Sequence, residues 1–264
     1  MITATVKYND NYTDIEFPCS EAYLSAKLME IHVDDLSSIT HYISAITEPK
    51  ELSFLKDRLV NLDELNYLAK RMDSFFGDEE TQFFEAIKLE HFTEMKDLIN
   101  LTFNLDKYTL IKDVSDMGKV GRKYLLNTEG CIPADDEDNP KYAEIGRKLL
   151  QSGQGVFTEH GLLFPDRNRP FEELYNGKTF PAYIYDQCLF VGEIEYEGQT
   201  EFIYLPDDER AIQKAFRRLG AKSPENCSIT LSNFCFEHNK VFELFKDILN
   251  NEGIYKANSL AQKI

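Results

Sequence analysis

The sequence predicts an α+β protein, an elongated multi-domain chain in which small units of antiparallel β-sheet and helix surround a helical middle domain. Three observations support this class. Residues 2–17 alternate as two short strands do, residues 59–104 carry apolar side chains at helical spacing, and residues 191–219 repeat the N-terminal pattern. The expected domains are a ββαβ unit (1–58), a helical domain (59–104), an α/β domain (105–165) and an extension (166–264) that contains a second ββαβ-like unit.

Each element of the N-terminal unit has a local signal. The strand pair of residues 2–17 turns at Asn9-Asp10-Asn11 and ends at Pro18, which cannot continue a strand ladder. Ser20 is placed to cap a helix, in which apolar residues then recur at helical spacing. Residues 38–45 predict the third strand.

The middle of the chain predicts mostly helices. Asn61 and Glu64 have the spacing of a capping box, so a helix is expected to begin there. Residues 165–180 contain Pro and Gly and predict a linker. Between these points we expect helices at 78–89, 93–101, 113–126 and 141–150, a strand at 108–111, a charged loop at 129–140, and a hairpin at 156–164 that turns at His160-Gly161.

Residues 191–219 match the N-terminal unit at a constant offset of 188 positions. Ser20 and Asp208 correspond as helix caps, and residues 37–40 match residues 227–230 after a further shift of two. The gapless spacing favours an internal duplication of a strand–strand–helix–strand unit; convergence of two ordinary ββα patterns is the alternative. The matched pairs are Val6/Ile194, Tyr8/Tyr196, Ile15/Ile203, Phe17/Leu205, Pro18/Pro206, Glu21/Glu209, Leu24/Ile212, Leu28/Phe216 and Ile31/Leu219.

The composition restricts the kinds of partner. With 46 acidic and 29 basic residues and a net charge of -17, the chain repels nucleic acid and anionic membranes and attracts basic surfaces, of which DNA-binding clefts are the best-known example. No apolar run reaches the ~18–20 residues of a membrane span, and no signal peptide is expected. The five scattered cysteines are typical of reduced thiols, so we expect a cytoplasmic protein.

No motif predicts catalysis, a cofactor or a metal site. Gly153-Gln154-Gly155 is a lone G-x-G without a third glycine, and the P-loop, HExxH and GxSxG patterns are absent. Glu159 and His160 could form a general-base pair, but a turn at His160-Gly161 is the simpler interpretation. The acidic run 135–138 fails as an EF-hand because Pro140 takes the place of the required glycine. A weak surface cation site or a plain solvated loop stays open there.

The acidic residues gather in particular segments. Residues 1–165 hold 30 acidic and 17 basic residues, and a second surplus lies within 193–209. Glu193, Glu195 and Glu197 are expected on one face of a strand, ~6.6–6.8 Å apart, which is about two phosphate steps of ~3.4 Å along one DNA strand. An ordinary polar hairpin face explains this stripe equally well. The candidate partner-binding carboxylates are Asp78, Glu79, Glu80, Glu85, Asp135, Asp136, Glu137, Asp138, Glu193, Glu195, Glu197, Glu201, Asp207, Asp208 and Glu209.

Three separated blocks resemble the ArdA family of antirestriction proteins: residues 62–69, the acidic loop that leads to residues 132–134, and the signature segments within residues 142–164. Residues 142–149 (YAEIGRKL), 155–157 (GVF) and 160–164 (HGLLF) resemble the C-terminal family signature of Y-x-x-x-G-R-x-L, G-x-F and H-G-x-F. The last segment departs from the signature, because it reads H-G-x-x-F or H-G-x-L, depending on the alignment. Residues 62–69 (LDELNYLA) are similar to the L-x-E-L-N-x-L helix of the family, and the acidic loop at Ile132-Pro133-Ala134 resembles its counterpart. The resemblance covers about residues 1–165.

The resemblance implies a DNA mimic. ArdA proteins are elongated acidic homodimers without catalytic residues or cofactors, and they occupy the DNA-binding groove of type I restriction–modification enzymes, so that mobile DNA such as that of phages escapes restriction. Residues 166–264 extend beyond the usual family end, so an inhibitor of another defence system, for example a CRISPR–Cas effector, is an alternative. An acidic or metal-dependent enzyme and a plain interaction module are the remaining interpretations.

Overall fold

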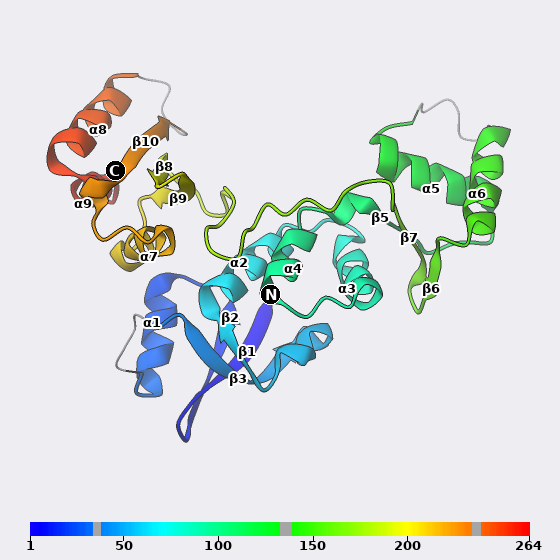
Figure 1. The fold of residues 1–264 in the computed structure, drawn as a ribbon, viewed down its shortest axis with the longest axis horizontal. Coiled ribbons are helices and arrows are strands. Elements are labelled where there is room, and N and C mark those ends of the chain that lie inside the picture. Colours follow the sequence, from blue (N-terminus) through cyan, green and yellow to red (C-terminus); the bar gives the residue numbers. More distant parts are fainter. Residues whose placement is uncertain (34–37, 133–138, 234–238) are drawn as a thin grey trace. The chain divides into compact units, whose positions relative to one another are not determined.

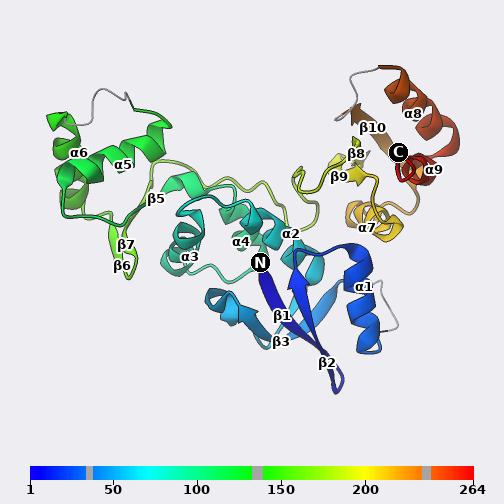
Figure 2. The same ribbon diagram turned by 180° about the vertical axis from the view of Figure 1, so that it is seen from behind.

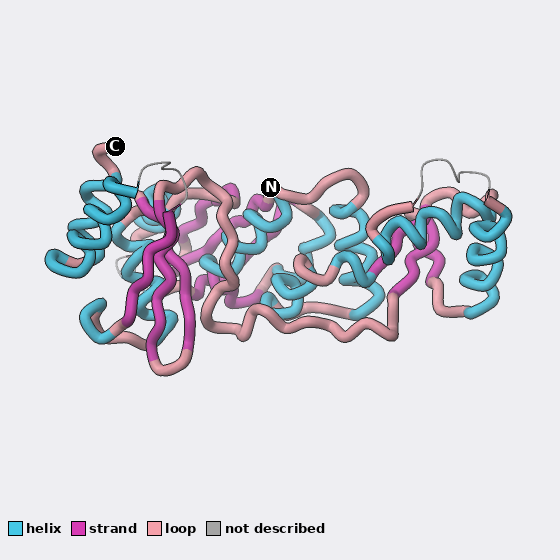
Figure 3. The backbone as a smooth tube through the Cα atoms, turned by 90° about the horizontal axis from the view of Figure 1, so that it is seen from above, coloured by secondary structure: helices cyan, strands magenta, loops and turns pink. Residues whose placement is uncertain are grey.

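The computed structural model describes residues 1–33, 38–132, 139–233 and 239–264 (Figure 1). It has a mixed α+β fold with three small antiparallel sheets, as the sequence predicts, and their strands are magenta in Figure 3. Contacts divide the chain into two compact units. The first unit contains Met1–Pro18 and Lys27–Glu173, and the second contains Cys19–Ala26 and Leu174–Ile264.

The N-terminal sheet has the order β2-β1-β3-β4, with β1 (Ile2–Tyr8), β2 (Asn11–Phe17), β3 (Thr40–Glu48) and β4 (Arg58–Asn61). Helix α1 (Glu21–Glu30) follows β2, and the backbone N–H of Tyr23 donates to Ser20 Oγ at 3.2 Å, which confirms the predicted cap. The buried face of β2 consists of Thr13, Ile15 and Phe17, in the alternation expected of a strand. The short strand β4 and the 3-10 helix η1 (Lys50–Leu55) were not predicted, because neither is long enough to show a period.

The helical region of the first unit contains α2 (Leu62–Asp73), α3 (Glu79–Glu90) and α4 (Met95–Leu101). The Asn61 side chain accepts hydrogen bonds from the backbone N–H groups of Asp63 and Glu64, so α2 begins where the capping signal indicated. In α3 every residue from Gln82 to Ile87 is buried. These six consecutive buried residues carry no polar stripe by which sequence periodicity could separate inner from outer positions in this part of the helix.

The third part of the first unit combines a small sheet with two helices. The sheet has the order β5-β7-β6, with β5 (Tyr108–Ile111), β6 (Val156–Thr158) and β7 (Gly161–Pro165), preceded by the 3-10 helix η2 (Leu105–Lys107). Helices α5 (Met117–Glu129) and α6 (Pro140–Ser152) lie side by side in Figures 1 and 2. They approach so closely that a Cβ on Gly121 would lie 1.9 Å from the Tyr142 carbonyl oxygen.

The start of α5 differs from the prediction. We expected a helix from residue 113, but the helix begins at Met117. Asp116 caps it by accepting from the backbone N–H groups of Gly118 and Lys119, and Asp113 instead accepts from Ser115 in a preceding turn. Both aspartates have the chemistry of a cap, and the sequence alone did not distinguish them.

The second unit contains the sheet β10-β8-β9, formed by β8 (Phe190–Tyr196), β9 (Gln199–Leu205) and β10 (Ser228–Asn233). Helix α7 (Glu209–Leu219) follows β9, and the 3-10 helix η4 (Pro224–Asn226) precedes β10. Helices α8 (Asn239–Glu252) and α9 (Ile254–Ala261), which were not predicted, close the core. That core includes Phe190, Ile194, Ile203, Phe216 and Phe245.

The two ββαβ segments are structural repeats. Ile2 pairs with Phe17 and Tyr8 with Asn11 in the first segment, and the same register displaced by 188 residues pairs Phe190 with Leu205 and Tyr196 with Gln199 in the second. In both sheets the first strand lies between the second and the third. The residue after the first strand has a left-handed conformation in each, with φ of 53° at Asn9 and 48° at Glu197.

The predicted alignment of the third strand was wrong by four residues. We matched Ser38 with Ser228, but Ser228 pairs with Glu195 whereas Tyr42 pairs with Lys7, so Tyr42 is the structural equivalent of Ser228. An even shift leaves every side chain on the same face of the strand. The alternation of polar and apolar residues therefore could not reveal the error.

Candidate acidic binding surfaces

Two of the three acidic residues at the start of α3, Asp78 and Glu79, already make contacts within the first unit. Asp78 Oδ1 pairs with Lys112 Nζ at 2.7 Å, and this hydrogen bond holds the pKa of the Asp78 carboxyl below its usual value. The side chain of Glu79 accepts from the backbone N–H of Phe76 at 2.8 Å. Glu80 is exposed beside them. Of the three, Glu80 is the carboxylate best placed to meet a partner.

Glu85 is not on the surface, which corrects our expectation. Its side chain is 3% exposed and accepts from Lys88 Nζ at 2.9 Å, and its Oε1 lies 2.9 Å from His160 Nδ1. Burial raises the pKa of Glu85, but the hydrogen bonds from Lys88 and His160 lower it more, so the pKa lies below its usual value. The Glu85 carboxylate is therefore bound within the first unit, by Lys88 of the same helix and His160 of the β6–β7 turn, and is not available to a partner.

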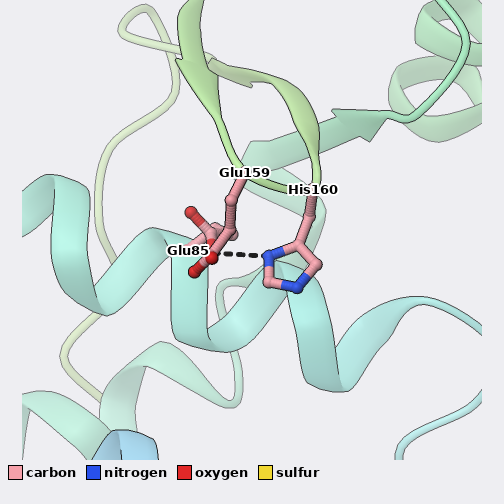
Figure 4. Close-up of side chains that lie close together, drawn as sticks. All are labelled: Glu85, Glu159 and His160. Atoms are coloured by element: carbon pink, nitrogen blue, oxygen red, sulfur yellow. Dashed lines mark hydrogen bonds and ion pairs between the residues drawn. The ribbon is translucent and has the colours of Figure 1, made fainter.

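Glu85 belongs to a network that attaches the β6–β7 hairpin to α3 (Figure 4). Glu159 and His160 are the two residues between Thr158 and Gly161, so the predicted hairpin is confirmed, but it turns at Glu159-His160, one residue before the predicted His160-Gly161 step. Lys88 Nζ lies 2.9 Å from Glu159 Oε1 as well as 2.9 Å from Glu85 Oε1. One ammonium thus bridges the buried carboxylate of the helix and the exposed carboxylate of the turn.

The same network has the residue types of a metal site. Ligand atoms of Glu85, Glu159 and His160 all lie within 4.8 Å of one another. Lys88, however, already supplies a positive charge at hydrogen-bonding distance from both carboxylates. A divalent cation would have to displace this ammonium, so the arrangement is better explained as a salt-bridge network.

A cavity of about 250 Å³ opens beside the network. Glu51 of η1 and Glu80 of α3 both line it and are exposed, so acidic residues from two elements border one space. Sequence reasoning missed Glu51, because 29 positions separate it from Glu80 and no local pattern connects them. We call this the acidic cavity; its lining consists of Pro49, Glu51, Glu80, Thr81, Phe84, Glu85, Lys88 and His160.

The second unit presents carboxylates on one face of β8. Glu193 and Glu195 are exposed on the same side of the strand, as predicted, opposite Thr230 and Ser228 of β10. We call Glu193 and Glu195 the acidic strand face. Glu197 does not belong to it, because β8 ends at Tyr196 and Glu197 occupies the turn with a φ of 48°.

Glu201 is a buried residue, which is a second correction. Its side chain is 2% exposed, pairs with Arg218 Nε at 3.0 Å and accepts from the backbone N–H of Phe180 at 3.2 Å. Burial raises the pKa of Glu201 above its ordinary value, and Arg218 opposes only part of that rise. The alternation contained a signal for this burial, since Glu201 has the same parity as Ile203 and Leu205, which point into the core.

The remaining predicted carboxylates have mixed roles. Asp208 caps α7 by accepting from the backbone N–H of Arg210 at 2.8 Å. The backbone of Asp207 bonds to the Asn258 side chain, and its carboxylate accepts from the backbone N–H of Asp208 at 2.7 Å. Both are half-buried, whereas Glu209 is exposed. Asp135, Asp136, Glu137 and Asp138 lie outside the described residues.

Several residues of the ArdA-like blocks have structural roles here. Gly146 allows the close approach of α6 to α5, because a Cβ there would lie 2.2 Å from the Met117 carbonyl oxygen. Gly161 has a φ of 135° and lies against the backbone of β5, and Phe164 is buried in the core of this region. Leu65 is buried in α2.

No model of a known protein family matches the chain, and a search of curated proteins finds no match either. Among the helices that the structure describes, none combines the length and the apolar character needed to cross a bilayer.

Proposed function

We propose that the protein is a cytoplasmic inhibitor that acts as a DNA mimic, using surface carboxylates to occupy the basic DNA-binding groove of a defence enzyme. Type I restriction–modification enzymes are the first expected target, on the strength of the resemblance to ArdA. The proposal assigns no catalytic residue and no cofactor to the chain, and it expects a homodimer as the acting form.

The observation that carries the proposal is a surplus of carboxylates, several of which lie on helices and strands. Acidic residues outnumber basic residues by 30 to 17 over residues 1–165. In the second unit, Glu193 and Glu195 form no ion pair with a Lys, Arg or His of the described part of the chain. A surface of this kind competes for the cations that a DNA-binding protein directs at phosphates.

Carboxylates on a fixed backbone compete with DNA phosphates better than carboxylates on a flexible segment do. Glu80 lies in α3 and Glu195 in β8, so the backbone of each is fixed by regular hydrogen bonding. Binding then costs less conformational entropy than it would for a flexible acidic tail. Contacts to phosphate-binding groups carry no base sequence, so the inhibitor is expected to act on enzymes of different DNA specificity.

The test is inhibition of purified type I enzymes. Several enzymes with different recognition sequences are assayed for ATP-dependent DNA cleavage at low salt, with the protein at micromolar concentration. We expect inhibition of all of them, relieved by added salt. Unchanged cleavage in every case would refute the proposal, and inhibition of a single enzyme would contradict recognition through phosphate-binding groups.

One observation favours a second target class. The acidic strand face replaces Thr5 and Lys7 of the first repeat by Glu193 and Glu195, so the two repeats do not present the same charge. The second unit is therefore the candidate determinant for another nucleic-acid-binding defence protein, such as a CRISPR–Cas effector. The double variant Glu193→Lys/Glu195→Lys should then weaken inhibition of that effector more than inhibition of type I cleavage, to which the carboxylates of the first unit also contribute.

A further inference from the structure

The third strands of the two repeats differ in their neighbours. In the first repeat β3 has β1 on one side and β4 on the other, with His41 opposite Val60 and Ile43 opposite Arg58. In the second repeat β10 pairs with β8 alone, and none of the described residues forms a strand on its other side. The second sheet thus ends at an edge that the first sheet fills with a fourth strand.

The register identifies the backbone groups at this edge. The β8–β9 hairpin closes on Tyr196 and Gln199 around a two-residue turn, so Tyr196 directs its N–H and C=O groups toward β9. Because this direction alternates along a strand, Glu195 and Glu193 direct theirs toward β10, where they meet Ser228 and Thr230. The N–H and C=O groups of Ile229 and Leu231 therefore point away from β8.

The first repeat supports this assignment. Ile43 is the equivalent of Ile229, since Ile43 pairs with Val6 and Ile229 with Ile194. The carbonyl oxygen of Ile43 points away from β1 and accepts a hydrogen bond from the backbone N–H of Asp57 at 2.8 Å. In the first repeat, Asp57, immediately before β4, thus bonds to the carbonyl oxygen of Ile43. The equivalent carbonyl oxygen in the second repeat is that of Ile229, which points away from β8.

The two faces of the second sheet indicate the chemistry of a segment that would fit. One face is covered, since Phe190, Ile194 and Ile203 pack in the core with α7, α8 and α9. The other carries Glu193 and Glu195, with the exposed hydroxyl residues Ser228 and Thr230 between them and the edge. A strand added beside β10 would lie two strand spacings, about 10 Å, from β8. Extended Lys or Arg side chains of the added strand span most of that distance, which brings their charged groups close to the carboxylates of Glu193 and Glu195.

We propose that the outer edge of β10 binds an extended basic segment of a partner protein, which adds to the sheet as an antiparallel fourth strand with alternate Lys or Arg side chains above Glu193 and Glu195. Backbone hydrogen bonds at Ile229 and Leu231 give the affinity, and the acidic strand face selects basic side chains. A second copy of the chain is the less favourable occupant, because pairing two β10 edges would place two acidic strand faces on one continuous surface.

This inference does not rest on DNA mimicry, because it concerns main-chain pairing with a peptide. The probe is an array of eight-residue peptides with Lys or Arg at alternate positions and Val, Ile, Thr or Tyr between them. Binding to the full-length protein is measured by fluorescence anisotropy at low salt. Each binding peptide is also made in two N-methylated forms, which block the amides on one edge of the strand or on the other.

Strand addition predicts that one N-methylated form loses binding and that the other retains it, because only one edge of the peptide faces β10. Hydrogen exchange should slow at the amides of Ile229 and Leu231 when the peptide binds. Equal binding of both N-methylated forms would mean attraction by charge alone and would overturn the proposal. So would the absence of any binding peptide in the array, or a dimer of the protein that the peptides dissociate.

Charge selection has a matched control within the chain. Glu193→Lys/Glu195→Lys reverses two exposed carboxylates on β8, and Asp14→Lys/Glu16→Lys makes the same change on the exposed face of β2. The first variant should weaken peptide binding about tenfold or more, and the second should leave it within about twofold. Equal losses in the two variants would show that net charge, rather than the acidic strand face, governs binding.

Discussion

The two repeats share a backbone and differ in the chemistry that they display. Ile15 and Ile203 occupy equivalent buried positions, and the pairing of the first two strands is identical after a displacement of 188 residues. The outward positions have diverged, with Thr5 and Lys7 in one repeat and Glu193 and Glu195 in the other. The inward alternation is sufficient to specify the sheet, so the outward face can differ in charge between the repeats without a change of fold.

The contact between strand and helix also differs between the repeats at one equivalent pair. Thr13 Oγ1 donates to Glu30 Oε2 at 3.0 Å in the first repeat, and 188 residues later Glu201 pairs with Arg218 at 3.0 Å. The first contact is between a neutral hydroxyl and an exposed carboxylate. The second is an ion pair whose members are 2% and 16% exposed. The strand and helix positions in contact are equivalent in the two repeats, but loss of one partner should destabilise the second repeat more than the first.

The largest expected effect comes from removing the buried carboxylate. Glu201→Ala breaks the buried ion pair with Arg218 and should lower the stability of the second unit by about 3–5 kcal/mol. Thr13→Ala removes one hydrogen bond and should cost about 1 kcal/mol in the first unit. Native-state hydrogen exchange of β9 and β2 amides measures both. Similar losses in the two variants would contradict the distinction between the repeats.

A shared core position should respond equally in both repeats. Ile15→Val and Ile203→Val each delete one buried methylene at equivalent sites, so each should cost about 0.5–1.5 kcal/mol. The exchange rates of the slowest amides in each sheet report the loss. A cost confined to one repeat would mean that the two cores are packed differently despite their common register.

The two buried carboxylates should give the two units opposite pH dependence. The pKa of Glu85 is lowered, so its contribution to stability is present above the ordinary Glu pKa and is lost as pH falls through the lowered value. The pKa of Glu201 is raised, so its contribution is present at low pH and is lost as pH rises through the raised value. Hydrogen exchange in α3 and in β9 between pH 3 and 7, repeated for Glu85→Gln and Glu201→Gln, tests this. The same sign in both units would contradict the assignment.

The smallest expected effect concerns the hairpin turns. Glu197 has a left-handed conformation that Asn tolerates better, and Asn9 occupies the equivalent position in the first repeat. Glu197→Asn should therefore stabilise the second unit by less than about 1 kcal/mol, measured by chemical denaturation. Asn9→Glu should destabilise the first unit by a similar amount. A loss of stability in Glu197→Asn would indicate that the Glu197 side chain supports the turn.

The sequence predicted the elements that repeat a pattern over many residues. Strand alternation located β1, β2, β8 and β9, and the Asn61 signal located the start of α2. The strand alternation could not align β3 with β10, because the four-residue shift between the predicted and the observed alignment preserves the alternation. Helices α8 and α9 were not predicted from their sequence.

The candidate carboxylates were predicted less well than the strands. Composition indicated an acidic surface, but burial depends on contacts that local sequence does not encode. Glu85 is enclosed because His160, 75 positions away, and Lys88 meet it in the folded first unit. The burial of Glu201 was predictable from local sequence, since Glu201 alternates in step with Ile203, which lies on the inner face of β9.

The central claim is that surface carboxylates take the place of DNA phosphates. The most direct measurement is equilibrium competition between this protein and a duplex carrying the recognition site for the methyltransferase core of a type I enzyme, followed over a range of salt concentrations. If the carboxylates mimic phosphates, the two ligands exclude each other and the affinity of the protein falls steeply with salt, as that of DNA does. A ternary complex with DNA, or an affinity independent of salt, would contradict it.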